Sequence, residues 1–445
     1  MSLQSALLAT AAEPRPEALE RLQSRIPTEW IDAALAATGV ATMRRRRLPV
    51  EQAIWLVIGI GLFRDLAIEQ VVDALEIALP GAGGAVAKSS IPAARARLGE
   101  APIKWLFERI ARHWSRASAE RHRWRGLTVY GIDGSSLRTA DTAANREYFG
   151  GWPTGAGKAD SSNPLVRMVT LLVLRSHLVA AARFAPYATN SELSLARELL
   201  DDIPNDSLTI FDALYMSMSF LHAVATAPNR HWLTKAKSTT KMKVVRTLGP
   251  GDDLVEMVTD DTARKRDPSL PRTWRARAIT YEPATGKRRV LMTSLLDPKL
   301  YPADEIRDLY RERWELELAY DELKTEVLDA EVALRSKTPS AARQELWGVL
   351  IAFNLVRLEM EHVAKEAKVT PTRVSFAASL VMVRAQFDWS AIARSPGAIP
   401  RQLASLRGRL KRLILPPRRA HRRYPREIKN DYRRYPRKKA APTAK

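Results

Sequence analysis

The chain has no cysteine, and this absence excludes several kinds of chemistry at once. Disulfide bonds, thiolate zinc sites and cysteine nucleophiles all need a thiol, so none of them operates here. A bound metal must therefore be held by oxygen atoms or by some of the seven histidines. A chain without cysteine is also in line with the reducing conditions of the cytosol.

Long apolar runs are missing as well. No stretch reaches the roughly 18 apolar residues that a membrane-spanning helix needs, and residues 1–17 lack the positively charged start of a secretion signal. The apolar run at residues 53–63 is short and internal, so it predicts a buried helix. We expect neither membrane insertion nor secretion.

Acidic residues are too few to balance the basic ones. Against 71 lysines and arginines there are 49 aspartates and glutamates, which gives a formal net charge of +22. A compact protein with this charge repels itself unless a polyanion lies nearby, and both nucleic acid and an anionic membrane meet that need. The basic cluster at residues 44–47 has two open interpretations, a solvated loop or a contact with DNA phosphates.

Apolar patterning predicts a folded chain with two or three packed units, because hydrophobic residues make up 46% of its 445 residues. Residues 16–116 have the apolar spacing of helices. The period changes to two at residues 127–133, where we expect a sheet to begin. An α/β core is indicated by further strand-like runs at residues 166–174, 178–184 and 208–212 and by a helix-like segment at 192–200.

The second half of the chain predicts strands first and helices afterwards. Residues 212–310 alternate apolar and polar positions, with turn dipeptides, and are expected to be rich in strands. From Pro302 the pattern is helical through residue 328, and more helices are expected to about residue 415. The tail from Pro416 is dense in arginine, lysine, proline and tyrosine, so we expect disorder until it meets a polyanion.

Two aspartates stand where a metal site would need them. Asp133 follows the strand-like residues 127–132 and precedes residues 134–136, which favour a turn, so we expect the strand to end at Asp133. Asp212 ends the run 208–211 in the same way. Neighbouring strands would bring the two carboxylates together, as metal-assisted phosphodiester cleavage requires. Taken singly, each aspartate also fits a turn or a helix cap.

One helical stripe adds groups that would act on DNA. Tyr310, Arg313, Glu317 and Lys324 fall at spacings of three, four and seven residues and are expected to share one helix face. A carboxylate beside arginine, lysine and tyrosine would place a metal ligand next to phosphate-binding donors. The same spacing also fits an ordinary charged helix with salt bridges.

These residues resemble a known family, the insertion sequence 4 family of bacterial DDE transposases. The stretch from Tyr310 to Lys324 matches its signature of Tyr, two residues, Arg, three residues, Glu, six residues, Lys at every signature position. The segment from Asp133 to Gly150 is similar to the family's first catalytic segment, and residues 90–99 are similar to its N-terminal helical domain. The resemblance covers roughly residues 44–355.

The second aspartate motif departs from the family. Many relatives have Asp-Arg-Gly-Phe, whereas Asp212 is followed here by Ala213, so a neighbouring DNA contact is missing while the carboxylate remains. Some relatives hold a flipped base on a tryptophan of the inserted domain. For Trp232 and Trp274 we expect core packing instead.

The resemblance implies a DNA transposase that cleaves DNA at the ends of its element and transfers the strands into target DNA by a two-metal mechanism. Two Mg²⁺ ions, for which Mn²⁺ can substitute, are the implied cofactors. The implied partners are double-stranded DNA, as terminal inverted repeats and as target, and a second copy of the chain in a DNA-bound homodimer, with no membrane; the implied location is the cytoplasm, at the bacterial nucleoid. The residues implied are Asp133, Asp212 and Glu317 for catalysis and metal binding, and Tyr310, Arg313 and Lys324 for DNA binding.

The expected fold class is α/β, with a ribonuclease H-like catalytic core, a β-rich insertion, a helical N-terminal domain and a helical C-terminal region. The expected divisions are residues 1–120 for the helical, end-binding N-terminal domain, 121–228 for the first part of the core, 229–300 for the insertion, 301–360 for the second part of the core with the glutamate helix, 361–415 for the helical C-terminal region, and 416–445 for the basic tail.

Two other functions stay open at this point. The chain is alternatively a catalytically inactive DNA-binding protein derived from a transposase, although its three carboxylates are all present. A basic protein of the membrane surface, or one that binds RNA, is the third hypothesis, and only the charge and the tail support it.

The tail supports a first prediction. Deleting residues 416–445 should weaken nonspecific DNA binding and make its dependence on salt less steep. With fewer phosphate contacts, fewer counterions are released from the DNA when the protein binds. A titration of DNA binding at several salt concentrations measures both effects. An unchanged affinity together with an unchanged salt slope would contradict the role of the tail.

Overall fold

A computed structural model describes residues 26–40, 48–75, 88–151, 163–282, 288–328 and 333–390, together with residues 407, 411, 414 and 415. Three features of the sequence lie outside these described residues: the basic cluster at residues 44–47, the glycine-rich residues 81–84 and the tail from Pro416.

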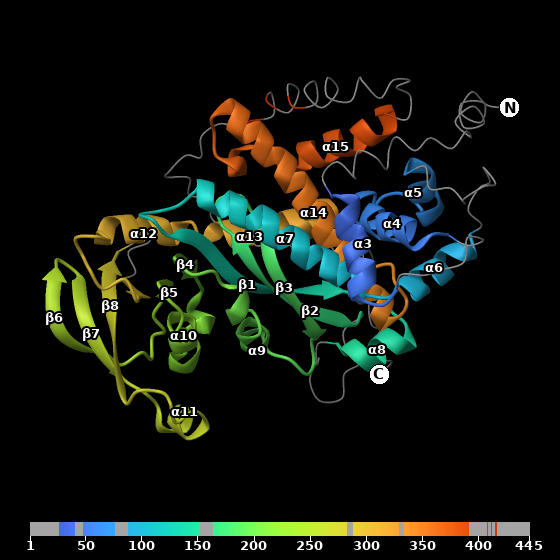
Figure 1. Cartoon of the computed structure of the whole chain (residues 1–445). Coiled ribbons are helices and arrows are strands. Elements are labelled where there is room, and N and C mark those ends of the chain that lie inside the picture. Colours follow the sequence, from blue (N-terminus) through green and yellow to red (C-terminus); the bar gives the residue numbers. More distant parts are fainter. Residues whose placement is uncertain are drawn as a thin grey trace, which may run out of the picture.

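A nine-stranded sheet forms the middle of the molecule (Figure 1), in the order β3-β2-β1-β4-β5-β9-β8-β7-β6. With helices packed on it, this sheet confirms the expected mixed α/β class. The strands are β1 (Thr128–Arg138), β2 (Leu165–Val173), β3 (Val179–Pro186), β4 (Ser207–Ile210), β5 (Arg230–Lys235), β6 (Lys243–Gly249), β7 (Asp252–Val258), β8 (Thr273–Tyr281) and β9 (Arg289–Thr293).

Neighbouring strands are parallel at the centre of the sheet and antiparallel on both sides of it. β4 lies between β1 and β5 and pairs in parallel with each, whereas β1 pairs antiparallel with β2, and β2 with β3. The strands from β9 to β6 extend the sheet as an antiparallel series that begins where β9 pairs with β5. The strand-rich segment after Asp212 therefore continues the central sheet and does not form a second one.

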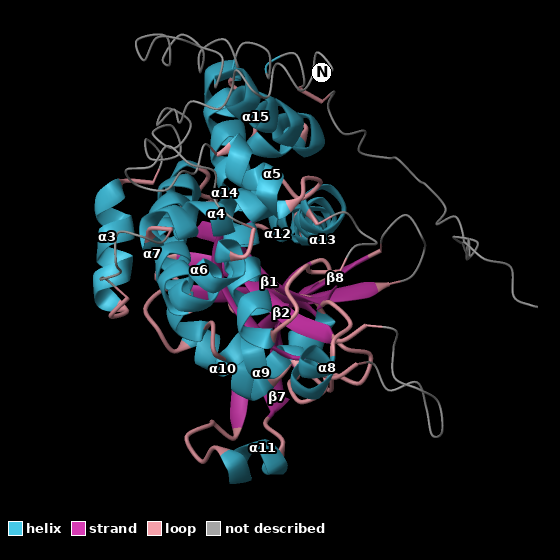
Figure 2. Ribbon diagram, turned by 90° about the vertical axis from the view of Figure 1, so that its right-hand side faces the viewer, coloured by secondary structure: helices cyan, strands magenta, loops and turns pink. Residues whose placement is uncertain are grey.

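Helices cover both faces of the sheet (Figures 1 and 2). One apolar core joins one face to the helices of both chain ends, and a second core packs the other face against α9 and α10. The helices that contribute side chains to the first core are α3 (Thr28–Ala37), α4 (Val50–Leu62), α5 (Ile68–Ala74), α6 (Ser90–Leu98), α7 (Ala101–Arg121), α8 (Ala143–Phe149), α12 (Ala303–Arg311), α13 (Trp314–Asp321), α14 (Pro339–Ala367) and α15 (Phe376–Ser390). The other α-helices are α9 (Glu192–Arg197), α10 (Met218–Ala225) and α11 (Asp261–Arg266).

The short apolar run at residues 53–63 lies in helix α4 and its C-cap, and α4 is buried along nearly its whole length, as predicted. It packs on α14, and Gly61 and Gly348 make the close approach possible. A Cβ atom on Gly348 would lie 2.5 Å from the carbonyl oxygen of Val57. Among the described residues, no helix is both long and apolar enough to span a bilayer.

The two tryptophans of the strand-rich segment pack against each other, as expected. The side chain of Trp232 is buried, with 2% exposed, and its ring lies 5.9 Å from that of Trp274.

The prediction of one continuous helix from Pro302 to residue 328 is wrong in one respect. The helix is interrupted by a turn between α12 and α13. The break falls at Glu312 and Arg313, and α13 continues into a π-helical turn, η3 (Glu322–Val327). Arg175, which follows β2, holds the carboxylate of Glu312 with two hydrogen bonds of 2.8 and 2.9 Å. A tertiary contact that spacing does not reveal therefore accompanies the break.

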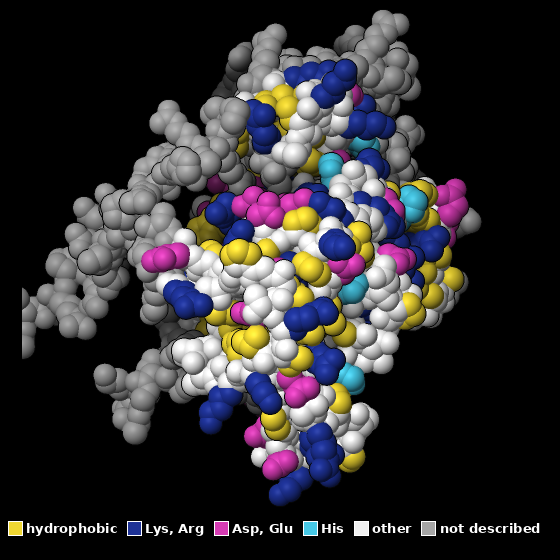
Figure 3. Space-filling view, turned by 90° about the vertical axis from the view of Figure 1, so that its left-hand side faces the viewer, with side chains coloured by type: hydrophobic (Ala, Val, Ile, Leu, Met, Phe, Trp, Pro, Cys, Tyr) yellow, Lys and Arg dark blue, Asp and Glu magenta, His cyan; other side chains and the backbone are white. Residues whose placement is uncertain are grey.

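Basic side chains are spread over the face near β6 to β8, and acidic and apolar ones lie among them (Figure 3). The net charge of +22 is therefore not gathered into one basic patch on that face.

A second prediction concerns the contact between α4 and α14. The change Gly348→Val places carbon atoms where the Val57 backbone already lies, so the free energy of unfolding should fall by about 1–3 kcal/mol. Urea denaturation measures this loss. The control is Ser340→Val, on the exposed first turn of the same helix; equal losses in the two variants would refute the steric explanation.

Candidate active site

Asp133 lies inside a strand and not at its end, which corrects the prediction from its sequence neighbours. β1 runs on to Arg138, because Gly134, Ser135 and Ser136 pair with β2. On the other flank β4 stops at Ile210, the partner of Gly131. The backbone beside Asp133 is therefore paired on one side only, and its carboxylate lies at the open flank.

Asp212 lies two residues beyond the end of β4, after Phe211. Its carboxylate accepts a hydrogen bond of 2.7 Å from the backbone N–H of Leu214 and so caps the short helix η2 (Ala213–Tyr215). The hydroxyl of Thr234 on β5 donates to the Asp212 carbonyl oxygen at 2.7 Å. Because β1 and β4 are parallel neighbours, both aspartates emerge at the same edge, as predicted.

The carboxylate of Asp133 is hard to ionise in this setting. Burial, together with the negative charges of Asp212 and Glu192, raises its pKa to about 6. The backbone N–H of Gly134, which donates to Asp133 Oδ1 at 2.8 Å, and the nearby Arg313 oppose that rise. Burial therefore contributes most to the raised pKa of Asp133, and the neighbouring negative charges add to it.

The segment from α12 to η3 brings the signature residues to the aspartates. Arg313 Nη2 donates to Glu317 Oε1 at 2.6 Å, and the charge of Arg313 is also felt by Asp133. Lys324 is half-buried, and burial lowers the pKa of its amine although the charge of Asp133 opposes this. Tyr310 lies at the end of α12, and burial raises its pKa to about 12.

A glycine lets α13 lie directly on β1. A Cβ atom on Gly131 would lie 2.8 Å from the side chain of Leu316. On the same helix, the hydroxyl of Tyr320 donates to the carbonyl oxygen of Asp133 at 2.6 Å. Packing and a hydrogen bond thus join the strand of the first aspartate to the helix of Glu317.

Glu317 contacts Arg313 and does not form a cluster with the aspartates. Among the residues that the structure describes, no three acidic or histidine side chains are grouped closely enough to hold a metal ion. Glu317 is held instead by Arg313, in an ion pair of 2.6 Å. The structure therefore brings Asp133 and Asp212 together. Glu317 is paired with Arg313, and the charge of Arg313 also acts on Asp133.

Glu192 is a site residue that sequence reasoning missed. It opens α9 on the opposite face of the sheet, and its carboxyl group occupies the space beside Gly134, where a Cβ atom would lie 2.5 Å from Glu192 Cδ. Burial, together with the charge of Asp212, raises its pKa, and Arg167, at 3.5 Å, opposes the rise. Its only signal in the sequence is a place in the first turn of a capped helix.

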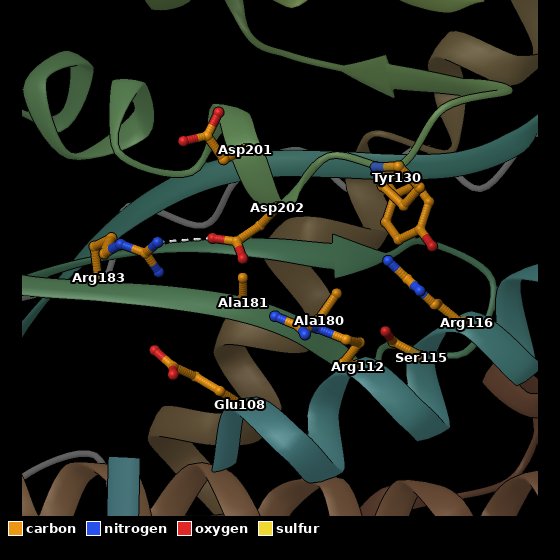
Figure 4. A pocket seen from close by; sticks show the side chains of 11 residues that line it. Glu108, Arg112, Ser115, Arg116, Tyr130, Ala180, Ala181, Arg183, Asp201 and Asp202 are labelled. Atoms are coloured by element: carbon orange, nitrogen blue, oxygen red, sulfur yellow. Dashed lines mark hydrogen bonds and ion pairs between the residues drawn. The ribbon is translucent and has the colours of Figure 1, made fainter. Parts of the chain in front are cut away.

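A pocket of about 80 Å³ lies elsewhere, between α7 and the edge strand β3 (Figure 4). The short helix η1 (Leu200–Asp202) closes it. Arg183 forms an ion pair of 2.7 Å with Asp202 there. None of Asp133, Asp212 and Glu317 lines this pocket.

Comparison with known proteins decides which family this geometry belongs to. The family model "Insertion element 4 transposase N-terminal" matches residues 16–108, and "Transposase DDE domain" matches residues 124–355. The transposase InsG for insertion sequence element IS4 of Escherichia coli (strain K12) is 38% identical over 423 residues, which cover 94% of this chain and 93% of InsG. The chain belongs to the insertion sequence 4 family of DDE transposases.

It is therefore a transposase, an enzyme that acts on DNA, and the resemblance seen in the sequence is confirmed. A DDE domain implies dependence on a divalent metal. Among solved structures, the piggyBac transposase synaptic complex with hairpin DNA aligns with 92% of this chain, and this chain with 87% of it, at 12% identity and a TM-score of 0.43. That likeness is too slight to support an argument.

The raised pKa of Asp133 gives a third prediction, for protein kept in chelator. Since its folded pKa of about 6 exceeds the ordinary value of about 3.9, ionised Asp133 destabilises the fold. The protonated carboxyl group of Asp133 stabilises the fold. This contribution is complete below about pH 4 and is lost as the pH rises through 6. Asp133→Asn should therefore raise the melting temperature at pH 7, and the gain should vanish towards pH 4.

Melting temperatures recorded by calorimetry from pH 4 to pH 7 test this sign. Asp73→Asn, an exposed change on α5, is the control and should produce no such trend. If Asp133→Asn lowers the melting temperature equally at every pH, ionisation of Asp133 does not destabilise the fold.

Proposed function

We propose that this transposase cleaves DNA at the ends of its element and transfers the freed strands into target DNA with the help of two divalent metal ions. The pair formed by Asp133 and Asp212 is the observation that supports this most. Two carboxylates from adjacent parallel strands repel each other there, and phosphate-binding side chains stand beside them.

The donor set fits a hard divalent cation such as Mg²⁺, with Mn²⁺ as a substitute, since carboxylate oxygens are the preferred ligands. Asp133, Asp212 and Glu317 would hold it. A pair of such ions activates the attacking oxygen and stabilises the leaving oxygen. For Glu317 to join the aspartates, its ion pair with Arg313 has to loosen, and the arrival of a DNA phosphate gives Arg313 a competing partner.

The other signature residues act on the DNA in this proposal. Arg313 presents a guanidinium for bidentate contact with a phosphate. Lys324 brings a half-buried amine close to Asp133. Tyr310 has a buried ring and a pKa of about 12, so it stays protonated. Its hydroxyl group can donate a hydrogen bond to a phosphate oxygen.

The domain division belongs to the same proposal. We assign the strands β1 to β5 with α9, α13 and α14 to a ribonuclease H-like core. The division expected from the sequence put β5 in the insertion of residues 229–300, and we move β5 to the core because it pairs in parallel with β4. The insertion then consists of β6 to β9. We assign the helices before β1 to the binding of element ends. A cavity of about 690 Å³ between α6 and the start of α14, lined by Lys88, Arg335 and Lys337, supports this.

Assembly and location are further parts of the proposal. Cutting two ends and joining them to one target is best coordinated by two copies of the chain, so we propose a homodimer on DNA. The substrate places the enzyme at the bacterial nucleoid in the cytoplasm.

The fourth prediction tests the cleavage chemistry. Glu317→Gln should abolish magnesium-dependent cutting of a plasmid that carries the DNA flanking this gene, while DNA binding stays within about twofold, because phosphate contacts do not need the carboxylate. The matched control is Glu326→Gln, an exposed change on η3, which should cut normally.

Three outcomes separate the hypotheses. Discrete, magnesium-dependent ends made by the wild type and by Glu326→Gln, but not by Glu317→Gln, support the proposal. Cutting by Glu317→Gln would remove Glu317 from the catalytic set. Binding without cutting by any variant would favour the inactive DNA-binding descendant of a transposase.

A further inference from the structure

Three acidic side chains of the segment that carries Glu317 are held by basic groups from outside it. They are Glu312 at the break between α12 and α13, Glu315 on α13 and Glu322 at the start of η3. None of them belongs to the family signature. All three lie on the side of the segment that faces residues 174–178, which we name the β2–β3 turn, and α14.

The β2–β3 turn holds the first two of these carboxylates. Arg175 donates to both oxygens of Glu312, at 2.8 and 2.9 Å, and also to the carbonyl oxygen of His122 at 3.0 Å. His177, with 1% of its side chain exposed, lies with Nε2 2.8 Å from Glu315 Oε2.

Glu322 is held from two elements at once. His177 Nδ1 lies 3.0 Å from Glu322 Oε2, and Arg357 of α14 pairs with the same carboxylate. The guanidinium of Arg357 is fully buried and lies 5.0 Å from the ring of Phe376. The ion pair between Arg357 and Glu322, whose guanidinium is fully buried, is much less screened than a surface pair, so it holds a defined geometry.

Besides its contacts with residues 312–322, the hairpin that contains the β2–β3 turn is hydrogen-bonded to helices α7 and α14. Ser118 of α7 donates to the hydroxyl of Ser176 at 2.8 Å. Asn354 of α14 exchanges two hydrogen bonds of 2.9 Å with the backbone of Val179. His177 adopts a left-handed backbone with φ of +60°, which aims its ring at α13 and is uncommon for a residue other than glycine.

Helix geometry connects these pairs to the active site. Glu315 and Glu317 are two residues apart, which places them about 200° apart around α13. A contact that fixes Glu315 on one side therefore fixes the rotation at which Glu317 emerges on the other. Leu316, between them, packs on Gly131 of β1, so the helix is held from two directions.

We propose that Arg175 and His177 are positioning residues for the transposase reaction, which act with Arg357 to set the rotation of residues 312–324 and thereby the approach of Glu317 and Lys324 to Asp133. The inference rests on the proposed function, because it gives Glu317 a place in the metal site. Arg175 and His177 touch neither DNA nor metal in this role.

The first test is a charge exchange between Arg175 and Glu312. Arg175→Glu and Glu312→Arg should each slow single-turnover cleavage of DNA carrying the gene's flanking sequences by roughly tenfold to a hundredfold, as small misplacements of reacting groups do, while DNA affinity changes by less than about twofold. The double variant should recover to within about threefold of the wild type. A double variant no faster than the singles would overturn the inference.

Hydrogen exchange gives a readout that does not depend on cleavage. Backbone amides of residues 312–324 should exchange faster in Arg175→Glu and in His177→Asn. In the double variant that combines Arg175→Glu with Glu312→Arg, these amides should recover their protection. Asparagine is chosen because it tolerates a positive φ, so the turn keeps its backbone. Unchanged exchange in both single variants, or faster exchange with unchanged cleavage, would each overturn the inference.

Arg183→Glu is the matched control. Arg183 lies on the same hairpin and forms an ion pair with Asp202 whose side-chain exposures, 24% and 29%, are close to the 26% and 29% of Arg175 and Glu312. It should leave both readouts unchanged. If wild type itself does not cut, the proposed function fails, while exchange at residues 312–324 still decides whether the turn positions the segment.

Discussion

The parallel pairing of β1 with β4 is the constraint on which the rest of the site depends. Four residue pairs, from Thr128 with Ser207 to Gly131 with Ile210, set the register. β4 then stops while β1 continues along β2, so Asp133 and Asp212 meet at one open edge. A slip of one residue would turn Asp133 to the other face of the sheet. The apolar cores on both faces therefore maintain the active-site geometry as well as the fold.

The site holds carboxyl groups whose ionised forms the fold disfavours. Burial, together with the charge of Asp212, raises the pKa values of Asp133 and Glu192, and their ionised forms stay unfavourable until a cation arrives. Buried packing offsets this cost. Gly131 allows α13 to pack directly on β1, and Gly348 allows α4 to pack directly on α14.

Much of the site could be predicted from the sequence, because its parts are local. The spacing of Tyr310, Arg313, Glu317 and Lys324 needs only a helical period, and the period-two run before Asp133 needs only a strand. What failed was non-local. The strand passes beyond Asp133 because β2 pairs with its next residues, the helix breaks where Arg175 contacts Glu312, and Glu192 arrives from another face of the sheet.

The sequence by itself determined the class of chemistry: no thiol, an excess of positive charge, and carboxylates spaced as in DDE transposases. It determined the helices and strands wherever apolar periodicity was strong. Only the tertiary structure decided which carboxylates face one another, which of them arginine neutralises, and how the Glu317 helix is held. Those outcomes depend on strand register and on contacts between residues more than a hundred positions apart, and local patterns contain no information about either.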